Sequence, residues 1–194
     1  MGKIFYLIGK SSSGKDTVFK KLKEKFPQFR TVTLYTTRPM RQGEKDGQEY
    51  FFVTDEKSKQ IQDAGKMIEL REYHTVHGIW KYFTADDGQI CLEQSDYLMI
   101  GTLEAYQKMC DYFGKEKIVP LYIEVEDGER LFRALERERQ QKNPKYAELC
   151  RRFLADNEDF SEEKLKQCQI SKRFENRNLE ICLNEIMLYI QTKI

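Results

Sequence analysis

Short apolar runs alternate with longer amphipathic stretches along this chain of 194 residues. Runs rich in β-branched and aromatic residues predict strands. These runs occupy residues 3–8, 31–35, 49–53, 67–73, 79–84, 97–101 and 118–125. The runs at 3–8, 97–101 and 118–125 are largely apolar, as expected of strands that are buried on both faces of a sheet.

Between these strands, apolar positions recur with the 3.6-residue period of a helix. Helices are predicted at residues 15–26, 54–65, 102–114 and 178–191, and the densely charged stretch 127–160 is also helical. Thr54 or Asp55 can cap the second of these helices and Thr102 the third. Gly65 and Gly114 are placed to end them.

The alternation of buried strands and helices predicts an α/β fold in three layers, with a parallel core sheet covered by helices on both faces. Residues 31–83 are richer in strands and are expected to form a small mixed α/β lobe over the strand tips. The chain has no repeats and no Pro/Gly/Ser-rich linker, which favours one domain.

Composition excludes several classes of protein. Charged residues make up 34% of the chain but nearly cancel at +1, which argues against a polybasic binder of nucleic acid polymers. The apolar run near the N-terminus is too short to span a membrane. The cysteines are odd in number and form no C-x-x-C pair, so we expect buried thiols in a reducing cytoplasm rather than disulfides or a zinc site. They are Cys91, Cys110, Cys150, Cys168 and Cys182.

The stretch "GKSSSGKDT", residues 9–17, has the spacing of a phosphate-binding loop. It follows the first buried strand and opens an amphipathic helix, where backbone N–H groups from Ser11 to Lys15 can converge on phosphate oxygens. Lys15 supplies a point charge, while Asp16 stands where the general pattern has a hydroxyl and Thr17 follows one place later. The alternative is a Ser/Gly turn with a surface lysine.

A second set of anion-binding residues lies in "YTTRPMRQGEKDGQEYFFV", residues 35–53. Arg38 and Arg41 follow a predicted strand, and Tyr50 lies just inside the next one. Guanidinium forks match phosphate oxygens and a phenol adds a donor, so these side chains can enclose a terminal phosphate. The alternative is a solvated polar loop.

Together with "MIEL", "LFRALERER" and the late "FEN", these segments resemble guanylate kinases in order and spacing along nearly the whole chain. The resemblance implies a P-loop fold with a core (1–30, 85–126 and 161–194), a lobe that binds the nucleoside monophosphate (31–84) and a helical lid (127–160). It also implies that Arg38, Arg41 and Tyr50 hold the phosphate of GMP, and that Glu69 pairs with the guanine edge. A carboxylate can accept from the adjacent N1–H and N2–H₂ donors of guanine, but Glu69 could also be an outward charge on a strand.

On the ATP side, the resemblance implies ATP and Mg²⁺ as cofactors and Thr17 as the working hydroxyl of the loop. The residues expected to contact ATP are Gly9, Lys10, Ser11, Ser12, Ser13, Gly14, Lys15, Asp16, Thr17 and Asn176. Only Asp16 is foreign to the family pattern, and our hypothesis is that it faces the hydration shell of the metal.

The charged helices resemble a closing lid whose arginines stabilise the charge of the transferring phosphoryl group. Arg133 and Arg137 lie four residues apart on one helix face. The expected catalytic set is Lys15, Arg137, Arg133 and Arg151, and whether Arg151 or its neighbour Arg152 points inward is left open.

The chain also departs from the family pattern. "IGTLEA", residues 100–105, replaces an aspartate-rich segment, so that Ile100 and Thr102 stand where aspartates are usual and Thr102 is a candidate contact to guanine. Leu34 replaces a serine, and the usual Tyr-Gly-[ST] is matched to residues 77–79. There His77 could donate to a phosphate, and the alternative is a histidine of the pocket wall or a structural one, while Ile79 has no hydroxyl to offer. Discrimination between bases is therefore expected to be weaker than transfer itself.

Three functions follow from these residues. The first is ATP-dependent phosphorylation of GMP or dGMP by a cytoplasmic monomer or homodimer that binds small nucleotides and no membrane. The second is a related kinase that acts on another nucleotide or on a phosphorylated sugar. The third, which the retained Lys15 disfavours, is a non-catalytic guanylate-kinase-like binding module.

Overall fold

The computed structural model describes residues 1–41, 43–75 and 78–194. Its strands are β1 (Ile4–Ile8), β2 (Arg30–Thr31), β3 (Tyr35–Thr36), β4 (Phe51–Phe52), β5 (Met67–Thr75), β6 (Gly78–Ala85), β7 (Tyr97–Ile100), β8 (Ile118–Glu124) and β9 (Arg173–Glu175). Its α-helices are α1 (Lys15–Lys25), α2 (Asp55–Asp63), α3 (Leu103–Phe113), α4 (Asp127–Arg139), α5 (Tyr146–Asp159), α6 (Glu162–Gln167) and α7 (Leu179–Gln191). A short 3₁₀ helix, Lys115–Lys117, precedes β8.

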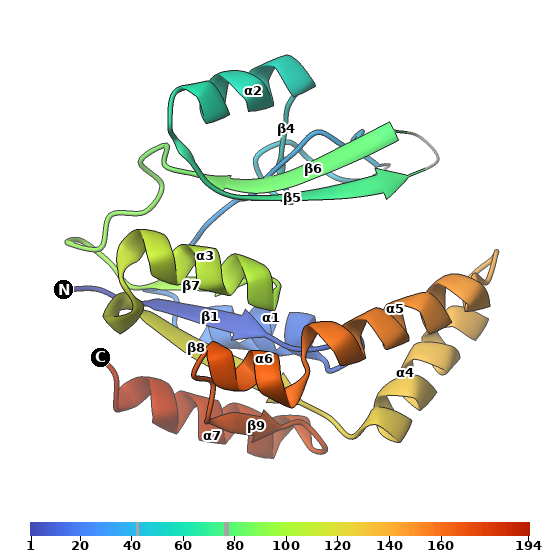
Figure 1. Ribbon diagram of the computed structural model, residues 1–194. Coiled ribbons are helices and arrows are strands. Elements are labelled where there is room, and N and C mark those ends of the chain that lie inside the picture. Colours follow the sequence, from blue (N-terminus) through green and yellow to red (C-terminus); the bar gives the residue numbers. More distant parts are fainter. Residues whose placement is uncertain (42, 76–77) are drawn as a thin grey trace.

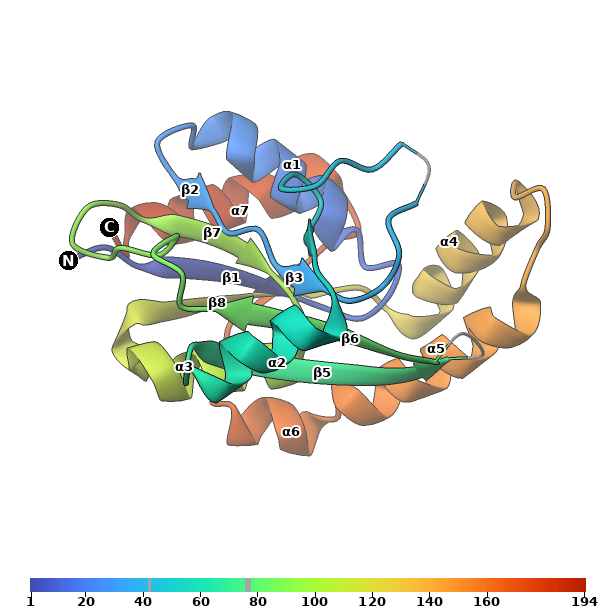
Figure 2. The same cartoon turned by 90° about the horizontal axis from the view of Figure 1, so that it is seen from above.

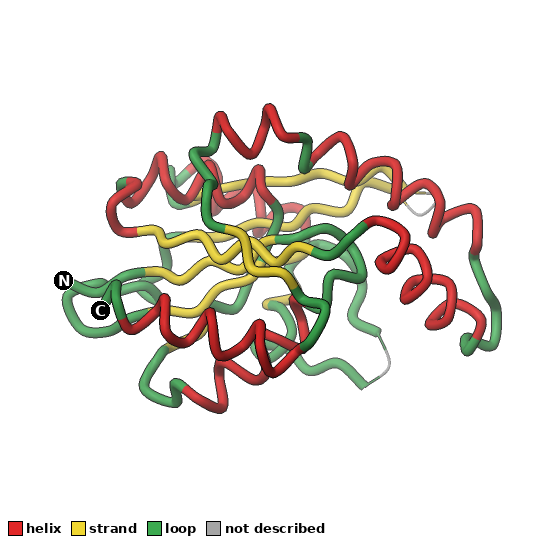
Figure 3. Tube along the Cα trace, turned by 90° about the horizontal axis from the view of Figure 1, so that it is seen from below, coloured by secondary structure: helices red, strands yellow, loops and turns green. Residues whose placement is uncertain are grey.

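The core is a parallel sheet in the order β2-β7-β1-β8-β9. All five residues of β1 are buried, and alternate residues of β1 contact different helices. Phe5 and Leu7 pack with α1 and α7, whereas Ile4, Tyr6 and Ile8 pack with α3 and α6. Figure 2 shows α1 and α7 on one side of this sheet and α3 and α6 on the other, and in Figure 3 helices flank the core strands on both sides. The predicted three-layer α/β arrangement is therefore confirmed.

A second, mixed sheet in the order β4-β3-β6-β5 forms the lobe. Strands β3 and β4 are parallel, whereas β6 is antiparallel to both β3 and β5. Helix α2 covers the outer face of this sheet, and the long hairpin β5–β6 lies above α3 and the core (Figures 1 and 2). Helices α4 and α5 project from the other end of the core, as Figure 2 shows.

The prediction of one strand at 31–35 is wrong. The segment is divided between β2, which pairs with β7 in the core sheet, and β3, which pairs with β4 and β6 in the lobe. Between them Val32 and Leu34 pack against the core cluster while the chain crosses from one sheet to the other. Apolar alternation alone cannot distinguish one strand from two strands in different sheets.

The charged stretch 127–160, which was predicted to be helical, consists of the two helices α4 and α5. Pro144 lies between α4 and α5, and a proline in a helix interior removes a hydrogen bond and clashes with the preceding turn. The sequence did not predict α6 or β9, which are short and polar. In the part of the chain that the structure describes, no helix is long and apolar enough to cross a membrane.

Candidate nucleotide site

The predicted phosphate loop connects β1 to α1 and is shaped by two glycines. Gly14 has φ 84°, a left-handed conformation that side chains rarely adopt. A Cβ at Gly14 would lie 2.5 Å from the Asn176 side-chain nitrogen, and one at Gly9 would lie 2.7 Å from the Ile123 carbonyl oxygen. The buried Asn176 Nδ2 donates to the Ser13 carbonyl at 2.9 Å. Asn176, which was expected to contact ATP, therefore holds the loop from its buried side through Ser13.

Not every loop N–H that was expected to face phosphate is free to do so. Ser11 N–H donates to Asp156 Oδ2 at 2.8 Å, and Ser13 N–H donates to the Lys10 carbonyl at 3.2 Å. Ser12, Gly14 and Lys15 supply the remaining N–H groups near the positive end of α1. Within the described residues, Ser13 Oγ is the one buried side-chain oxygen without a hydrogen-bond partner.

A buried arginine links the loop to α4 and α5, the two helices of the predicted lid. Arg130 of α4 has 1% of its side chain exposed. Its guanidinium donates to Asp127 Oδ1 at 2.8 Å, to Asn157 Oδ1 at 3.1 Å and to the Ser11 carbonyl at 3.1 Å. It also lies 3.4 Å from Asp156 Oδ2 and 4.7 Å from the centre of the Phe153 ring. Arg130, Asp127, Asp156 and Asn157 are called the Arg130 cluster below. Through them, the C-terminal part of α5 is held against the loop at Ser11.

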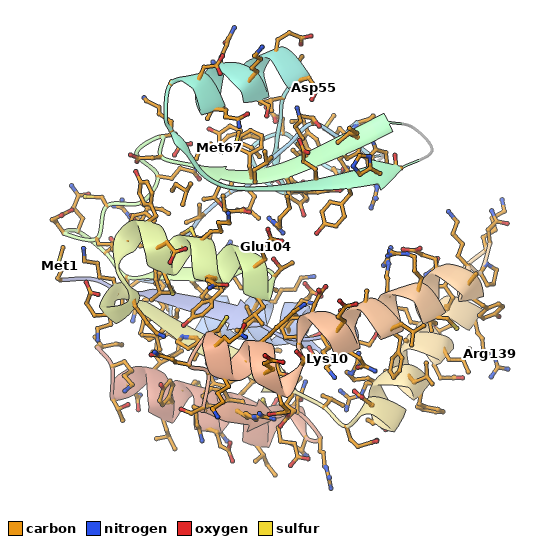
Figure 4. All side chains as sticks on the ribbon, viewed as in Figure 1. Met1, Lys10, Asp55, Met67, Glu104 and Arg139 are labelled. Carbon is orange, nitrogen blue, oxygen red and sulfur yellow. The ribbon has the colours of Figure 1, made fainter. Side chains whose placement is uncertain are left out.

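Lys10 joins the same cluster from the loop side. Its ammonium donates to Asn157 Oδ1 at 2.8 Å and to Asp127 Oδ1 at 3.3 Å. Figure 4 shows Lys10 at the end of the core where the lid helices begin, with Arg139 far out along α4. Lys10 was predicted as an ATP contact, and its hydrogen bonds in this structure are to the lid.

The arginines predicted for the lid divide into two groups. Arg137 Nη2 donates to Ser12 Oγ at 3.2 Å and so reaches the phosphate loop. Arg133 Nη2 donates to the carbonyl of Asn176 at 3.0 Å and so contacts the residue that holds the loop, not the loop itself. Arg151 and Arg152 are exposed and both bind Glu148 on their own helix, at 2.8 Å each. Neither Arg151 nor Arg152 contacts the loop in this structure.

In the lobe, Arg38 is 4% exposed and forms a fork with Glu44. Its Nη1 and Nη2 lie 2.7 and 2.5 Å from the two Glu44 oxygens, and its guanidinium lies 5.2 Å from the centre of the Tyr50 ring. Arg41 has an exposed side chain, and its backbone N–H donates to Glu44 at 2.7 Å. Glu44, for which no role was predicted, thus holds both predicted phosphate-binding arginines, Arg38 through its side chain and Arg41 through its backbone N–H.

Two further lobe residues were missed. Tyr82 of β6 has its ring 5.6 Å from that of Tyr50, and Thr84 Oγ1 donates to Glu69 at 2.9 Å. Tyr82 and Thr84 are thus further candidates beside Tyr50 and Glu69, and the match of Tyr-Gly-[ST] to residues 77–79 stays a prediction. His77 itself lies outside the described residues, and Ile79 is 45% exposed.

Glu69 and Thr102, the two candidates for contact with the guanine base, have different hydrogen-bond partners. Glu69 is 3% exposed, and Arg71 donates to it through Nε at 2.9 Å and Nη2 at 3.1 Å. Thr102 caps α3, because its hydroxyl accepts from the Ala105 N–H at 3.2 Å. A contact from Thr102 to guanine stays a prediction.

A metal site of several protein ligands is not present among the described residues, where no group of three or more His, Cys, Asp or Glu could hold an ion. Asp16 and Thr17 lie side by side in the first turn of α1, and both are exposed. One carboxylate and one hydroxyl suit Mg²⁺, which takes few protein ligands and keeps water and substrate phosphates around it.

The Arg38–Glu44 pair gives a prediction for stability against pH. The hydrogen bond from Arg38, together with the Arg41 N–H, lowers the pKa of Glu44 from 4.5 to about 2. A lowered pKa stabilises the fold above the unfolded value, and that contribution is lost as the pH falls from about 4.5 to 2. Glu44→Gln should therefore lose less stability than the wild type over this interval in urea unfolding.

The matched control is Glu72→Gln, which changes another exposed glutamate, on β5. It should follow the wild-type pH profile. If Glu44→Gln follows that profile too, the pair with Arg38 contributes nothing to acid stability.

Comparison with known proteins relates the N-terminal part of this chain to one family. Residues 1–79 match the family model described as Guanylate kinase. Curated guanylate kinases from Nitratidesulfovibrio vulgaris and Corynebacterium diphtheriae are 41% and 39% identical over 73 and 74 residues, which is 38% of this chain in each case. These matched segments span 35% and 39% of the relatives' own lengths.

The structural match extends further along the chain than the sequence match. A crystal structure of guanylate kinase from Anaplasma phagocytophilum aligns with 99% of this chain and 86% of its own, with a TM-score of 0.62 and 21% identity. The chain thus resembles guanylate kinases in sequence over its N-terminal part, and it has their P-loop fold along nearly its whole length.

Proposed function

We propose that this chain transfers the γ-phosphoryl group of ATP to the phosphate of GMP or dGMP. The observation that carries the proposal is that the fold holds two sets of anion-binding side chains, one at the core and one on the lobe. Lys15 and Arg137 gather at the phosphate loop of the core, and Arg38 and Tyr50 gather on the lobe. A kinase for a phosphorylated acceptor needs one such site for each substrate.

In the proposed reaction, the loop N–H groups and Lys15 bind the ATP phosphates at the positive end of α1. Arg38, Arg41 and the phenols of Tyr50 and Tyr82 bind the acceptor phosphate, whose oxygen attacks the γ-phosphorus. Because charge spreads over the phosphoryl oxygens in the transition state, a cation held beside the loop lowers its energy. Arg137 is the first candidate for that role, and Arg133, on the same helix, binds Asn176, which in turn donates to the loop at Ser13.

The proposal includes movement of the lobe (31–84) and lid (127–160) toward the core. Closure would exclude water and bring the acceptor to the phosphate loop. Arg151 and Arg152, which now bind Glu148, could reach the site only through such a movement.

Mg²⁺ would be held at the first turn of α1, with Thr17 as a direct ligand and Asp16 facing the hydration shell. When bound, it supplies charge neutralisation between the ATP phosphates. Asp16→Gly is accordingly expected to raise the Mg²⁺ concentration needed for half-maximal activity by a few-fold, because the variant loses one water-mediated contact to the metal. A Mg²⁺ titration at fixed ATP measures this.

The matched control is Asp111→Gly on α3, which removes an exposed carboxylate away from the loop. It should leave the titration unchanged. An unchanged titration for Asp16→Gly would reduce Asp16 to a favourable charge at the helix N-terminus.

The test of the function is ADP release with ATP and Mg²⁺, using GMP, dGMP, AMP, CMP, UMP and a set of sugar phosphates as acceptors. Turnover of GMP no faster than of the other nucleotides would reject the guanylate assignment, and turnover of a sugar phosphate alone would favour the second candidate function. No turnover together with no ATP binding would favour a non-catalytic module.

A further inference from the structure

Arg71 covers the carboxylate that was predicted to read the base. Both oxygens of Glu69 accept from Arg71, and one of them also accepts from Thr84. The Glu69 side chain is 1% exposed, whereas that of Arg71 is 11% exposed. A ligand that approaches this surface therefore meets the guanidinium before the carboxylate.

The orientation of Arg71 leaves one edge of its guanidinium available. A guanidinium is planar and carries five N–H donors in a fixed fork. Nε and Nη2 donate to Glu69, and Nη1 makes no hydrogen bond to the described part of the chain. The opposite edge, made of Nη1 and the second hydrogen of Nη2, presents two parallel donors.

This edge lies on the same face of the lobe as the predicted phosphate-binding residues. Arg71 is directly opposite Tyr82 in the β5–β6 ladder, and the Tyr82 ring contacts that of Tyr50, which in turn contacts Arg38. Burial raises the pKa of Tyr50, and the positive charges of Arg38 and Arg71 both oppose that rise. A nucleotide with its phosphate at Arg38 would thus extend its base toward Arg71.

Arg71 also lies near the core. Burial raises the pKa of Tyr6 on β1, and Arg71 opposes that rise while Glu69 adds to it. Arg71 and Glu69 therefore lie close enough to Tyr6 of the core sheet to act on it electrostatically. Their strand, β5, lies above α3 and β1 in Figure 1.

We propose that Arg71 reads the base through the O6 and N7 acceptors of a 6-oxopurine, and that Glu69 is a positioning residue that holds Arg71. The proposal rests on the proposed function only in that the acceptor phosphate binds at Arg38. A two-donor fork matches O6 and N7 of guanine, whereas adenine presents an acceptor beside a donor. Guanine and hypoxanthine are then accepted alike, because the 2-amino group of guanine is not read.

The test is equilibrium binding to the wild-type protein by calorimetry, with GMP, IMP, 7-deaza-GMP and AMP and without ATP. IMP should bind within about threefold of GMP, since it keeps O6 and N7. 7-deaza-GMP should bind roughly tenfold more weakly or worse, because one charge-assisted hydrogen bond is lost. The opposite pattern, with IMP weakened and 7-deaza-GMP equal to GMP, would overturn the proposal and return the reading to Glu69.

Variants add a second measurement. Arg71→Met should bring GMP and 7-deaza-GMP to the same affinity, and Arg71→Lys should not restore the difference, because an ammonium lacks the fork. Glu69→Gln should weaken the binding of GMP, while the ratio of the affinities for GMP and IMP stays near one. A direct contact from Glu69 to the 2-amino group would make that ratio change. Lys59→Met, an exposed change on α2, is the control and should leave all affinities unchanged.

The binding series also separates this inference from the proposed function. If the predicted order of affinities is found but no ADP is released with ATP and Mg²⁺, the kinase assignment fails and the role of Arg71 stands. If GMP is phosphorylated but 7-deaza-GMP binds as well as GMP, the role of Arg71 fails and the kinase stands. Absence of binding by every nucleotide in the series overturns the role of Arg71.

Discussion

Lys15→Met is expected to abolish phosphoryl transfer while leaving the fold intact. Lys15 is the first residue of α1, directly after the left-handed Gly14, so its ammonium is carried by the same turn that presents the loop N–H groups. Removing one positioned donor for developing charge typically costs roughly 10²–10³ in rate. We therefore expect a loss of about 10³-fold in kcat for ADP release, and Met keeps the length of the side chain.

The control for this prediction is Lys20→Met, an exposed lysine farther along α1. It should retain wild-type activity, and both variants should unfold at the wild-type temperature. A folded Lys15→Met protein with wild-type turnover would refute the assignment of residues 9–17 as the phosphate loop of a kinase.

The strand–loop–helix arrangement around residues 9–17 could be predicted because its determinants are local. A buried strand, two glycines at fixed spacing and an amphipathic helix lie within one continuous segment, and the structure places them as β1, the loop and α1. The same holds for the cap of α3 by Thr102 and that of α2 by Thr54, where one hydroxyl meets an N–H three residues later.

The residues that were missed act through partners distant in the chain. Arg130 was one charge among many in a helical stretch, and its partner Asp156 lies 26 residues later, on the next helix. The link from Ser11 to Asp156 spans 145 residues. Nothing in a periodicity of apolar positions indicates which charges of an amphipathic helix become buried.

The buried pair of Glu69 and Arg71 could not be predicted from the sequence for a different reason. Glu69 and Arg71 are two residues apart on one strand, so their side chains share a face, but an i,i+2 pair of opposite charge on a strand is usually solvated. Whether the pair lies in water or between two sheets depends on how the lobe meets the core. The hairpin register matters in the same way, since it places Tyr82 opposite Arg71 and Thr84 opposite Glu69.

Arg130→Met should destabilise the fold more than any other single change in the lid. The variant leaves Asp127 and Asp156 without the cation between them and removes the donor to the Ser11 carbonyl. Breaking a buried ion pair on one side costs about 3–5 kcal/mol. We expect about 3 kcal/mol, at the lower end of that range, because the Asp127 side chain is 44% exposed.

Urea unfolding measures this, with Arg139→Met as the matched control. Arg139 is on the same helix and pairs with Glu136, but 65% of its side chain is exposed, so its loss should cost about 0.5 kcal/mol or less. Arg130→Lys should fall between the two, since an ammonium keeps the charge but cannot reach Asp127, Asp156 and the loop at once. Equal stability of Arg130→Met and Arg139→Met would mean that packing of α5, and not the Arg130 cluster, holds the lid to the phosphate loop.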